Sequence, residues 1–491
     1  MNAITVEEML SLEQSLFDKG IDAATLMEQA GWGIACSMRK FFPSPGRALL
    51  YLGKGHNAGD ALCAARYLRR WGWQIEMHPA YPEIEWATLT RQQLRALEAV
   101  PQSEPNGLEE TVIIDGLLGI GARGELRDPI RSAVSAINAR RMAQAIRVVA
   151  LDVPTGLDAD TGATCEVAVV ADYTFAIGAP KIGLLKSKAV NHVGRLEVIA
   201  LQDLGVGPES DARLITPQSF PQSLPLRAHD FHKGDAGRVS VIAGSVGMEG
   251  AALMTATAAL RAGAGLVTLW VSADIYPTVS ARACPALMVR PYRQWRKISL
   301  DHADAVAIGP GLGLMSEEAF EVMVEMLDKN PCPGVLDADA LNAIAQHRGH
   351  HCLQARHVIT PHLREFTRLA PMSALRPREE ACAHFTENNP SVLLLKGART
   401  LVQQRGGPIY HNSTGHAGMA TAGMGDVLAG VIAGLQAQGM NALSSACAGS
   451  WICGRTAEII VSSRKQSTHS LIATDLLDNL GDALNEWQRA E

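Results

Sequence analysis

The stretch Gly418-Met419-Ala420-Thr421-Ala422-Gly423-Met424-Gly425-Asp426-Val427-Leu428-Ala429-Gly430 organises the C-terminal half of the sequence. Its small residues surround a single carboxylate, and an apolar run rich in Ala, Val, Ile and Leu begins immediately afterwards. This pattern predicts a tight turn that enters a buried helix. A helix start presents unpaired N–H groups and a positive dipole end, and glycine lets an anion approach that backbone closely. The stretch therefore predicts a phosphate cradle.

Asp426 lies where the predicted cradle meets the helix. Its carboxylate could take a proton there from a hydroxyl that is about to attack the bound phosphate. Asp is also a favoured helix N-cap and glycine is common in loops, so the stretch alone fits a capped helix start equally well. The choice between the two depends on the rest of the chain.

Length and composition indicate several domains and small-molecule ligands. A chain of 491 residues suggests two or three domains, and 47% hydrophobic residues permit substantial cores. The net charge of -6 and the scattered basic residues make nucleic acid an unexpected partner. Nine cysteines without a C-x-x-C pair indicate reduced thiols in a cytoplasm. We expect neither a secretory signal nor a membrane span, because the start is acidic and residues 251–271 contain Arg261 and two glycines.

The N-terminal half contains a strand followed by a glycine-rich loop and a helix. Residues 47–52 form a short apolar strand, residues 53–60 a loop, and the helix then continues to Arg70. This order places a ligand at the carboxyl end of a parallel strand. Asn57 and Asp60 add an amide and a carboxylate, which could hold an oxygen-ligated cation or a sugar hydroxyl.

Two further predicted strands end in polar loops. Residues 111–114 lead into Asp115, and residues 147–151 lead into Asp152 and Thr155. Taken alone, each Asp is more often a turn former or a helix cap. Polar residues on three successive parallel-strand ends nevertheless favour one crevice and one site.

This arrangement, with Leu-Met-Glu-Gln-Ala-Gly at 26–31 and Lys-Ile-Gly-Leu at 181–184, resembles the NAD(P)H-hydrate epimerase domain over residues 1–212. The resemblance implies a Rossmann-like fold and interconversion of the two epimers of hydrated NADH or NADPH. It implies that a potassium ion is held by Asn57, Asp115 and Thr155, and that Asp152 lies at the reacting nicotinamide ring. The implied substrate contacts are His56, Asn57, Ala58, Gly59, Asp60, Gly119, Gly121, Arg123 and Asp152.

The glycine-rich loop departs from the pattern of that family. His56, Ala58 and Ala61 stand where the family usually has Asn and two Gly. Each added Cβ removes access to positive φ and to the closest backbone approach. An alternative is therefore that this half is a non-catalytic nucleotide-binding or oligomerisation module.

A joint separates the two halves. Residues 201–231 are rich in Pro, Gly, Ser and Asp, and we place the linker at 213–224 and a second domain at 225–491. From Gly237 onward, strands, loops and helices alternate, which predicts an α/β domain with a mostly parallel sheet. The strands are predicted near residues 237–243, 305–308, 334–336, 357–359 and 391–395, and a helix at 250–261.

Five polar or glycine-rich loops follow these strands and precede the Asp426 turn, which favours chemistry at Asp426 over a simple cap. Lys396 and Arg399 offer charge for nucleotide phosphates, although a lone strand-end lysine is more often merely exposed. His362 could orient a polar ring substituent, but a single loop histidine is more often structural. The cluster His347, His350, His351 and Cys352 has no zinc spacing, and we interpret it as a solvated loop.

Five motifs occur in order in this half: Gly-Pro-Gly-Leu-Gly at 309–313, Asp-Ala-Asp-Ala-Leu-Asn at 337–342, Thr-Pro-His at 360–362, Leu-Lys-Gly at 395–397 and Gly-Met-Gly-Asp-Val-Leu at 423–428. The set resembles the ADP- or ATP-dependent NAD(P)H-hydrate dehydratases of the ribokinase-like superfamily. Together the halves resemble the bacterial bifunctional NAD(P)H-hydrate repair enzymes, which generally use ADP. A homo-oligomer without membrane or nucleic-acid partners is expected.

The resemblance implies phosphorylation of the hydroxyl of the S epimer, then loss of phosphate and reformation of the nicotinamide double bond, with AMP and phosphate released. Asp426 would be the base, and the N–H groups of residues 422–425 would stabilise the transferred group. Magnesium is expected, and Asp337 and Asp339 lie on a suitable loop. ADP or AMP would contact Lys396, Gly397, Ala398, Arg399, Thr400 and Gly425. The hydrated dinucleotide would contact Ala251, Gly311, His362 and Asp426.

Two departures and one rival function accompany this second resemblance. Leu363-Arg364 replaces the usual Pro-Gly after His362, and Ala422 replaces a glycine, so that its Cβ could crowd the transferred phosphate. The rival is a ribokinase-like kinase of the hydroxymethylpyrimidine or hydroxyethylthiazole type, which would leave a stable phosphate. The epimerase-like half argues against it.

Overall fold

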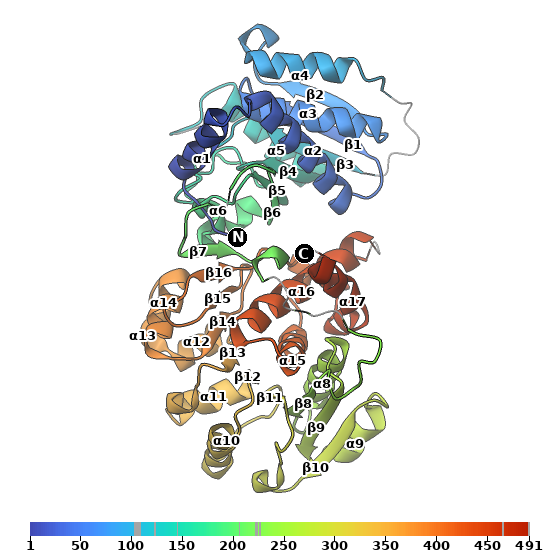
Figure 1. Ribbon diagram of the computed structural model, residues 1–491, viewed down its shortest axis with the longest axis vertical. Helices are drawn as coiled ribbons and strands as arrows, with labels where there is room; N and C mark the ends of the chain where they lie inside the picture. The colour runs from blue at the N-terminus through green and yellow to red at the C-terminus, as the bar shows by residue number, and fades with distance from the viewer. Residues whose placement is uncertain are drawn as a thin grey trace. The chain divides into compact units, whose positions relative to one another are not determined.

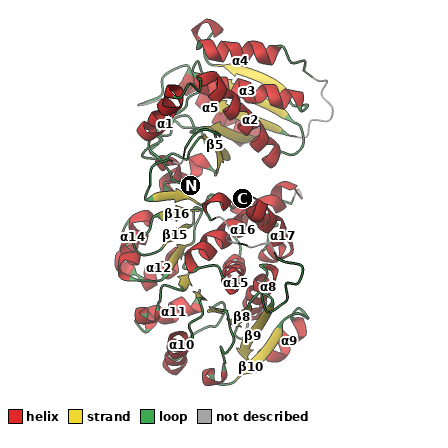
Figure 2. Cartoon of the chain, in the orientation of Figure 1, coloured by secondary structure: helices red, strands yellow, loops and turns green. Residues whose placement is uncertain are grey.

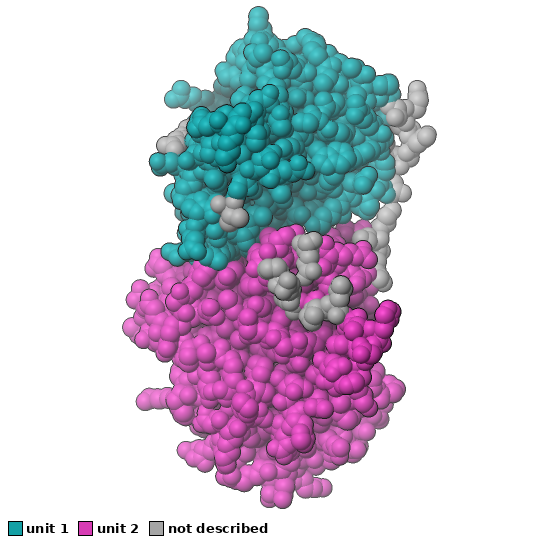
Figure 3. Space-filling model, in the orientation of Figure 1, with its two compact units in different colours: residues 1–214 teal, residues 215–491 magenta. Residues whose placement is uncertain are grey.

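The chain forms two compact units, Met1–Leu214 and Ile215–Glu491, shown in separate colours in Figure 3. The computed structural model describes residues 1–102, 110–121, 124–144, 146–205, 207–220, 224, 227–463 and 466–489. Among these residues, no helix is both long and apolar enough to cross a membrane.

Unit 1 contains a parallel sheet with the order β2-β1-β3-β4-β5-β6. The chain runs outward from β1 to β2 and then crosses back to β3, so the topological switch point lies between β1 and β3. The strands are β1 Arg47–Leu52, β2 Gln74–Pro79, β3 Thr111–Gly116, β4 Arg147–Leu151, β5 Tyr173–Ile177 and β6 Arg195–Ile199. The prediction that three polar strand ends meet is confirmed, because β1, β3 and β4 are neighbours.

Helices cover both faces of this sheet (Figure 1). Successive side chains of β1 point to opposite faces of the sheet. Leu50 packs with α2 and α3 on one face, whereas Leu49 and Tyr51 pack with α5 on the other. The main helices are α1 Val6–Asp18, α2 Ala23–Phe41, α3 His56–Arg70, α4 Thr88–Glu98 and α5 Ile130–Gln144; α6 Ile182–Leu185 and α7 Val190–Val193 are single turns, and β7 is Ala212–Leu214. Helix α3 begins at His56, so the predicted loop over 53–60 is too long by five residues.

Unit 2 has the sheet order β10-β9-β8-β11-β12-β13-β14-β15-β16. The strands from β10 to β14 are parallel, and β15 and β16 are antiparallel additions. They are β8 Arg238–Ile242, β9 Leu266–Ser272, β10 Met288–Tyr292, β11 Ala305–Ile308, β12 Gly334–Leu336, β13 His357–Ile359, β14 Val392–Leu395, β15 Leu401–Gln403 and β16 Ile409–His411. The predicted α/β class is thus confirmed for both halves, and the five predicted loops share one sheet edge.

The helices of unit 2 form a layer on each face, as Figure 2 shows. One core contains α8, α15, α16 and α17, and the other contains α10, α11, α12 and α14. Their bounds are α8 Glu249–Arg261, α9 Tyr276–Arg282, α10 Glu317–Lys329, α11 Asp339–Gln346, α12 Leu363–Leu369, α13 Pro371–Ala374, α14 Arg378–Asn388, α15 Met424–Ala437, α16 Ala442–Ser463 and α17 Ala473–Arg489.

Helix α15 is the buried helix that the sequence predicts. Every residue from Val427 to Ala437 is buried. Its glycines permit close contact with α8, since a Cβ built at Gly430 would lie only 2.1 Å from the Thr255 carbonyl oxygen. Gly434 is similarly placed against Ala259. The first turn of α15 therefore begins a helix that packs tightly against α8.

His357 in β13 is fully buried, and its burial lowers the pKa of the imidazole to about 4. Protonation therefore favours the unfolded chain below the unfolded pKa of about 6.5. We expect unit 2 to lose about 2 kcal/mol of stability between pH 7 and pH 5 through this group. Urea titrations followed by hydrogen–deuterium exchange of unit 2 peptides would measure the loss. His357→Asn should remove that part of the pH dependence, and an unchanged dependence would contradict this assignment.

Candidate active sites

The site of unit 1 begins with a buried carboxylate at the end of β3. Asp115 accepts hydrogen bonds from the Thr155 hydroxyl at 2.8 Å and the Thr155 backbone N–H at 2.9 Å. Burial raises the pKa of Asp115 to about 6, although these bonds and that from Leu117 act to lower it. A bound cation would favour the ionised carboxylate.

Asn57 reaches the same place from the first turn of α3. Its Nδ2 donates to the Leu118 carbonyl at 3.0 Å, and the Leu118 N–H donates to the Thr155 hydroxyl at 3.2 Å. The buried Oδ1 of Asn57 has no hydrogen-bond partner among the described residues. The structure thus brings the amide, carboxylate and hydroxyl of Asn57, Asp115 and Thr155 together around the end of β3.

Asp152 follows β4 in an unusual backbone conformation. Its φ is +63°, a region that is costly for a residue with a side chain, and its N–H donates to the Phe175 carbonyl at 2.8 Å. The side-chain Oδ1 accepts from the Ile177 N–H at 3.2 Å and from the buried Lys181 ammonium. A Cβ built at Gly119 would lie 3.5 Å from Oδ2, so this oxygen faces the Gly119 loop.

The charge of Asp152 also acts on the carboxyl groups of Asp60 and Glu13. Burial, and then the charges of Asp152 and Glu13, raise the pKa of Asp60 well above its usual value. Burial also raises the pKa of Glu13 in α1; Lys181 opposes this shift and Asp152 adds to it. The sequence interpretation named Lys181 only as part of a motif and missed Glu13, which lies 139 residues before Asp152 in the chain.

The substitutions in the glycine-rich segment cause no backbone strain. His56, Ala58 and Ala61 lie in the first two turns of α3, and none has a positive φ. Ala58 and Ala61 point into the core between α3 and the sheet, and Gly59 faces Met27 of α2. The lost access to positive φ therefore has no effect on this backbone, while the effect of these Cβ atoms on ligand fit stays a prediction.

Three further residues are predicted to contact the substrate of unit 1, namely His56, Gly121 and Arg123. His56 is exposed on the first turn of α3, and Gly121 lies beyond β3, where a built Cβ would meet no described atom within 4 Å. Arg123 lies outside the described residues, so its predicted substrate contact stays a prediction.

The site of unit 2 is centred on Asp426, the third residue of α15. Gly423 is the N-cap residue, with φ +89°, so Asp426 is not the cap that the simpler interpretation proposed. Burial, followed by the charges of Asp337 and Asp339, raises the pKa of Asp426 to about 6, although Lys396 opposes the shift. Ala422 is exposed and has no positive φ, so its backbone is unstrained in this turn.

Lys396 connects the strand end of β14 to the start of α15. Its Nζ donates to Asp337 Oδ1 at 2.8 Å and lies 3.9 Å from Glu365 Oε2. A Cβ built at Gly425 would lie 3.2 Å from this Nζ. Burial acts against the charge, but Asp337, Glu365 and Asp426 outweigh it and raise the pKa of Lys396. The alternative of a merely exposed strand-end lysine is wrong.

His362 has a structural function that the sequence left open. Its Nδ1 accepts from the Arg364 and Glu365 N–H groups, and its own N–H donates to Glu365 Oε2 at 2.8 Å. It therefore forms the N-terminal capping box of α12. The side chain remains about half exposed, and its Nε2 lies 3.4 Å from Glu365 Oε1. Glu365, which the sequence interpretation missed, links His362 to Lys396.

The two glycine-rich loops bring other predicted contacts together. Gly311 has φ +62°, and a Cβ built there would lie 2.9 Å from that of Ala251. The Gly313 N–H donates to Asp339 Oδ2 at 2.8 Å, which ties this loop to the Asp337–Asp339 loop. Ala338 between them has φ +47°, a strained value for alanine.

The segment 396–400 is partly open and partly buried. Gly397 and Ala398 are exposed, and the Thr400 hydroxyl donates to the Gly397 carbonyl at 3.3 Å. Arg399 is only 2% exposed, so its charge lies beneath this surface. The Arg378 guanidinium of α14, missed by the sequence interpretation, donates to the Leu395 and Lys396 carbonyls.

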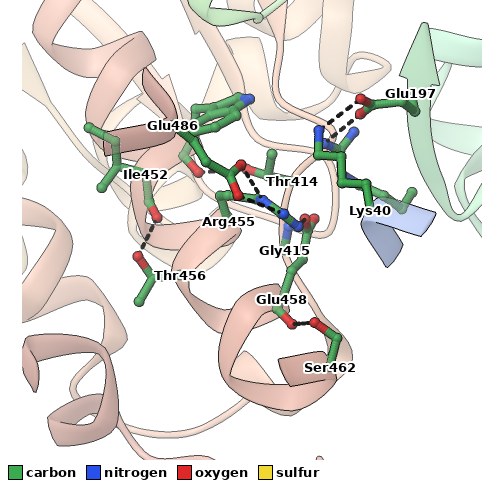
Figure 4. A network of polar contacts seen from close by, with 12 residues as sticks. Lys40, Glu197, Thr414, Gly415, Ile452, Arg455, Thr456, Glu458, Ser462 and Glu486 are labelled. Atoms are coloured by element: carbon green, nitrogen blue, oxygen red, sulfur yellow. Dashed lines mark hydrogen bonds and ion pairs between the residues drawn. The ribbon is translucent and has the colours of Figure 1, made fainter. Parts of the chain in front are cut away.

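The chain leading into the Asp426 turn is anchored by a buried network, drawn in Figure 4. Glu458 of α16 accepts from the Gly415 N–H at 2.9 Å. Arg455 donates to Glu458 at 3.0 Å and to both carboxylate oxygens of Glu486, at 2.7 and 2.8 Å. Such a bidentate pair holds the segment from Gly415 in place.

The histidine-rich segment is more ordered than a solvated loop. The His347 ring stacks on Phe320 at 4.7 Å, and His350 Nε2 donates to the Leu369 carbonyl at 2.8 Å. Cys352 is fully buried. Across the part of the chain that the structure describes, we found no set of three or more His, Cys, Asp or Glu side chains arranged to hold a metal.

Known families match both halves of the chain. Residues 23–183 match the family described as YjeF-related protein N-terminus, and residues 239–480 match the family described as NAD(P)H-hydrate dehydratase. The crystal structure of hypothetic protein SMU.573 from Streptococcus mutans covers 56% of this chain and 100% of its own, with 25% identity and a TM-score of 0.50.

Full-length relatives match both halves at once. The bifunctional NAD(P)H-hydrate repair enzyme Nnr of Coxiella burnetii is 35% identical over 494 residues, covering 97% of this chain and 98% of the relative. The Nnr enzyme of Escherichia coli is 34% identical over 482 residues, covering 95% and 90%. Identity above 30% across nearly the whole length shows that this chain belongs to the family of bifunctional NAD(P)H-hydrate repair enzymes.

Proposed function

We propose that the chain repairs hydrated NADH and NADPH, with unit 1 interconverting the R and S epimers and unit 2 dehydrating the S epimer. ADP is the phosphoryl donor, and AMP and phosphate are released. The observation that carries the proposal is Asp426, a carboxyl group with a pKa of about 6 on the first turn of a glycine-capped helix, beside Lys396.

In unit 2, Asp426 acts as the base that removes the proton from the substrate hydroxyl. A pKa near 6 leaves it ionised at neutral pH yet basic enough to accept a proton. The open N–H groups at the start of α15 and the Lys396 ammonium stabilise the charge of the transferred phosphoryl group. Gly397, Ala398 and Thr400 hold the adenine nucleotide, and Ala251, Gly311 and His362 hold the dinucleotide.

Magnesium accompanies the nucleotide in this proposal. Such an ion commonly binds through one or two carboxylates together with substrate phosphates. Asp337 and Asp339 fit that role, because both carry carboxylate oxygens and the charges of both act on Asp426. When bound, the ion would neutralise charge on the phosphates.

In unit 1, Asp152 is the residue at the reacting nicotinamide carbon, and Asn57, Asp115 and Thr155 hold a potassium ion. The buried, unpartnered Oδ1 of Asn57 supports this site, because an amide oxygen is a suitable ligand for a hard cation. His56, Asp60, Gly119 and Gly121 contribute substrate contacts. A cytoplasmic location accords with the nine free thiols, and we include a homo-oligomeric state in the proposal.

One assay tests the whole proposal. Mixed hydrated NADH epimers are incubated with ADP and Mg²⁺, and the recovery of NADH absorbance is followed. Recovery of both epimers at an enzyme-dependent rate is expected. If NADH is recovered only from the fraction that starts as the S epimer, and the rest follows at the slow rate of spontaneous epimerisation, unit 1 is non-catalytic. Accumulation of a stable phosphorylated product would favour the rival kinase.

The potassium site makes a separate prediction. Asn57→Leu removes the unpartnered oxygen, so about 10-fold more K⁺ or greater should be needed for half-maximal epimerisation. KCl titrations at constant ionic strength, balanced with tetramethylammonium chloride, measure this requirement. Gln93→Leu is the matched control, because Gln93 is also 8% exposed and also has a buried side-chain oxygen without a partner among the described residues. An unchanged K⁺ requirement in Asn57→Leu would exclude Asn57 as a ligand.

A further inference from the structure

Lys181 is a buried lysine whose surroundings assign it a function in unit 1. The residue is 0% exposed. A buried ammonium is costly unless it is paired and hydrogen-bonded. Its Nζ bonds to Asp152 Oδ1 and donates to the Ile177 carbonyl at 2.8 Å. The lysine thus spans from the end of β5 to the carboxylate that follows β4.

The contacts of Asp152 are divided between its two oxygens. Oδ1 accepts from both the Lys181 ammonium and the Ile177 N–H. Oδ2 instead faces Gly119, where a glycine leaves room that a side chain would fill. Since the Asp152 backbone is held at φ +63° by its N–H bond to Phe175, few adjustments remain for the side chain.

Two further carboxyl groups act on this pair. Glu13 from α1 and Asp60 from α3 both interact with Asp152 and with Lys181. A lysine among three carboxyl groups could pair with any of them, yet its hydrogen bond is to Asp152. The pairing is therefore selective for the residue at the reacting centre.

We propose that Lys181 is a positioning residue for epimerisation, which occupies Oδ1 of Asp152 so that Oδ2 alone is presented to the hydrated nicotinamide ring beside Gly119. This inference rests on the function proposed above for Asp152. Lys181 itself does not touch the substrate. Its effect on the rate comes from orientation, since a displacement of about 1 Å can cost about 100-fold in rate.

Two variants test the proposal in the full-length protein. Lys181→Met keeps the length of the side chain but removes its charge and donors, and we expect kcat for R-epimer conversion to fall about 100-fold. Lys181→Arg still donates to Asp152 but with a different geometry, and a fall of about 10-fold is expected. In both variants KM should change less than about threefold, because substrate contacts remain. A purely structural lysine would not separate kcat from KM in this way.

Each variant carries an internal control, because dehydration of the S epimer by unit 2 should keep its wild-type rate. Arg141→Met is the matched control within unit 1: it removes a different ion pair, with Asp172 at 2.8 Å, and should leave epimerisation unchanged. Thermal melting of unit 1 completes the comparison. If Lys181→Met does not fold, Lys181→Arg decides the question alone.

The outcomes separate this inference from the function on which it rests. Wild-type kcat in Lys181→Arg, or in a folded Lys181→Met, overturns the positioning role. Loss that appears in KM alone also overturns it. If Asp152→Ala keeps full R-epimer conversion, the proposed function of Asp152 has failed instead, whatever the Lys181 variants show.

Discussion

Asp426→Asn is expected to lower the rate of S-epimer dehydration by about 1,000-fold, within the range of 100 to 10,000 that a general base contributes. The amide has nearly the same shape but cannot accept the proton of the substrate hydroxyl. Nucleotide affinity should stay within a few fold, because the N–H groups of α15 and Lys396 remain. Single-turnover NADH recovery and calorimetric ADP titration measure the two quantities. Unchanged turnover would rule out Asp426 as the base.

We expect the same residue to set the acid limb of the pH profile for dehydration. With its pKa near 6, kcat/KM for dehydration should fall about tenfold per pH unit below pH 6. The direction follows from the charge, because a protonated carboxyl group cannot act as a base. A flat profile from pH 7 down to pH 5 would contradict this assignment.

Asp152→Ala should abolish enzymatic conversion of the R epimer, with a loss of at least about 100-fold. NADH recovery from a mixed sample should then be fast only up to the amount of S epimer present at the start. Further recovery should proceed at the slow rate of spontaneous epimerisation. The S-epimer rate of unit 2 is the control, since Asp152 belongs to the other sheet. Simultaneous loss of S-epimer turnover would indicate a folding defect instead. The decay of the R epimer, followed chromatographically, gives the measurement.

The parallel α/β class and the edge of each sheet that carries the polar loops could be predicted because they depend on local signals. Short apolar runs mark β1, β4 and β11, and polar or glycine-rich residues mark their ends. The alternation of such segments specifies a parallel sheet, and a parallel sheet brings its carboxyl ends together. Asp426 and Asp152 could be predicted as candidate site residues for that reason.

The residues of the two candidate sites that were not predicted depend on the directions of side chains, which no local sequence pattern encodes. Glu13, Glu365 and Arg378 come from helices whose exposed residues read as ordinary surface charge. The alanines of α3 illustrate the same limit, because the sequence cannot tell whether their Cβ atoms face the crevice or the core. The start of α3 was placed too late since its first turn carries Gly59 and no acidic residue, which obscures the helical pattern.

The close packing of α15 on α8 also determines which segment of unit 2 is best protected from amide hydrogen exchange. Amide protons between Val427 and Ala437 lie in a fully buried helix, so they should exchange with deuterium only when the whole unit opens. Immediately before this segment, residues 423–426 are partly exposed at the surface. Asp426 thus lies at the boundary between the segment expected to exchange most slowly and the solvent. If it is the base, we expect its position to be held by the rigid helix and not to depend on the movement of a loop.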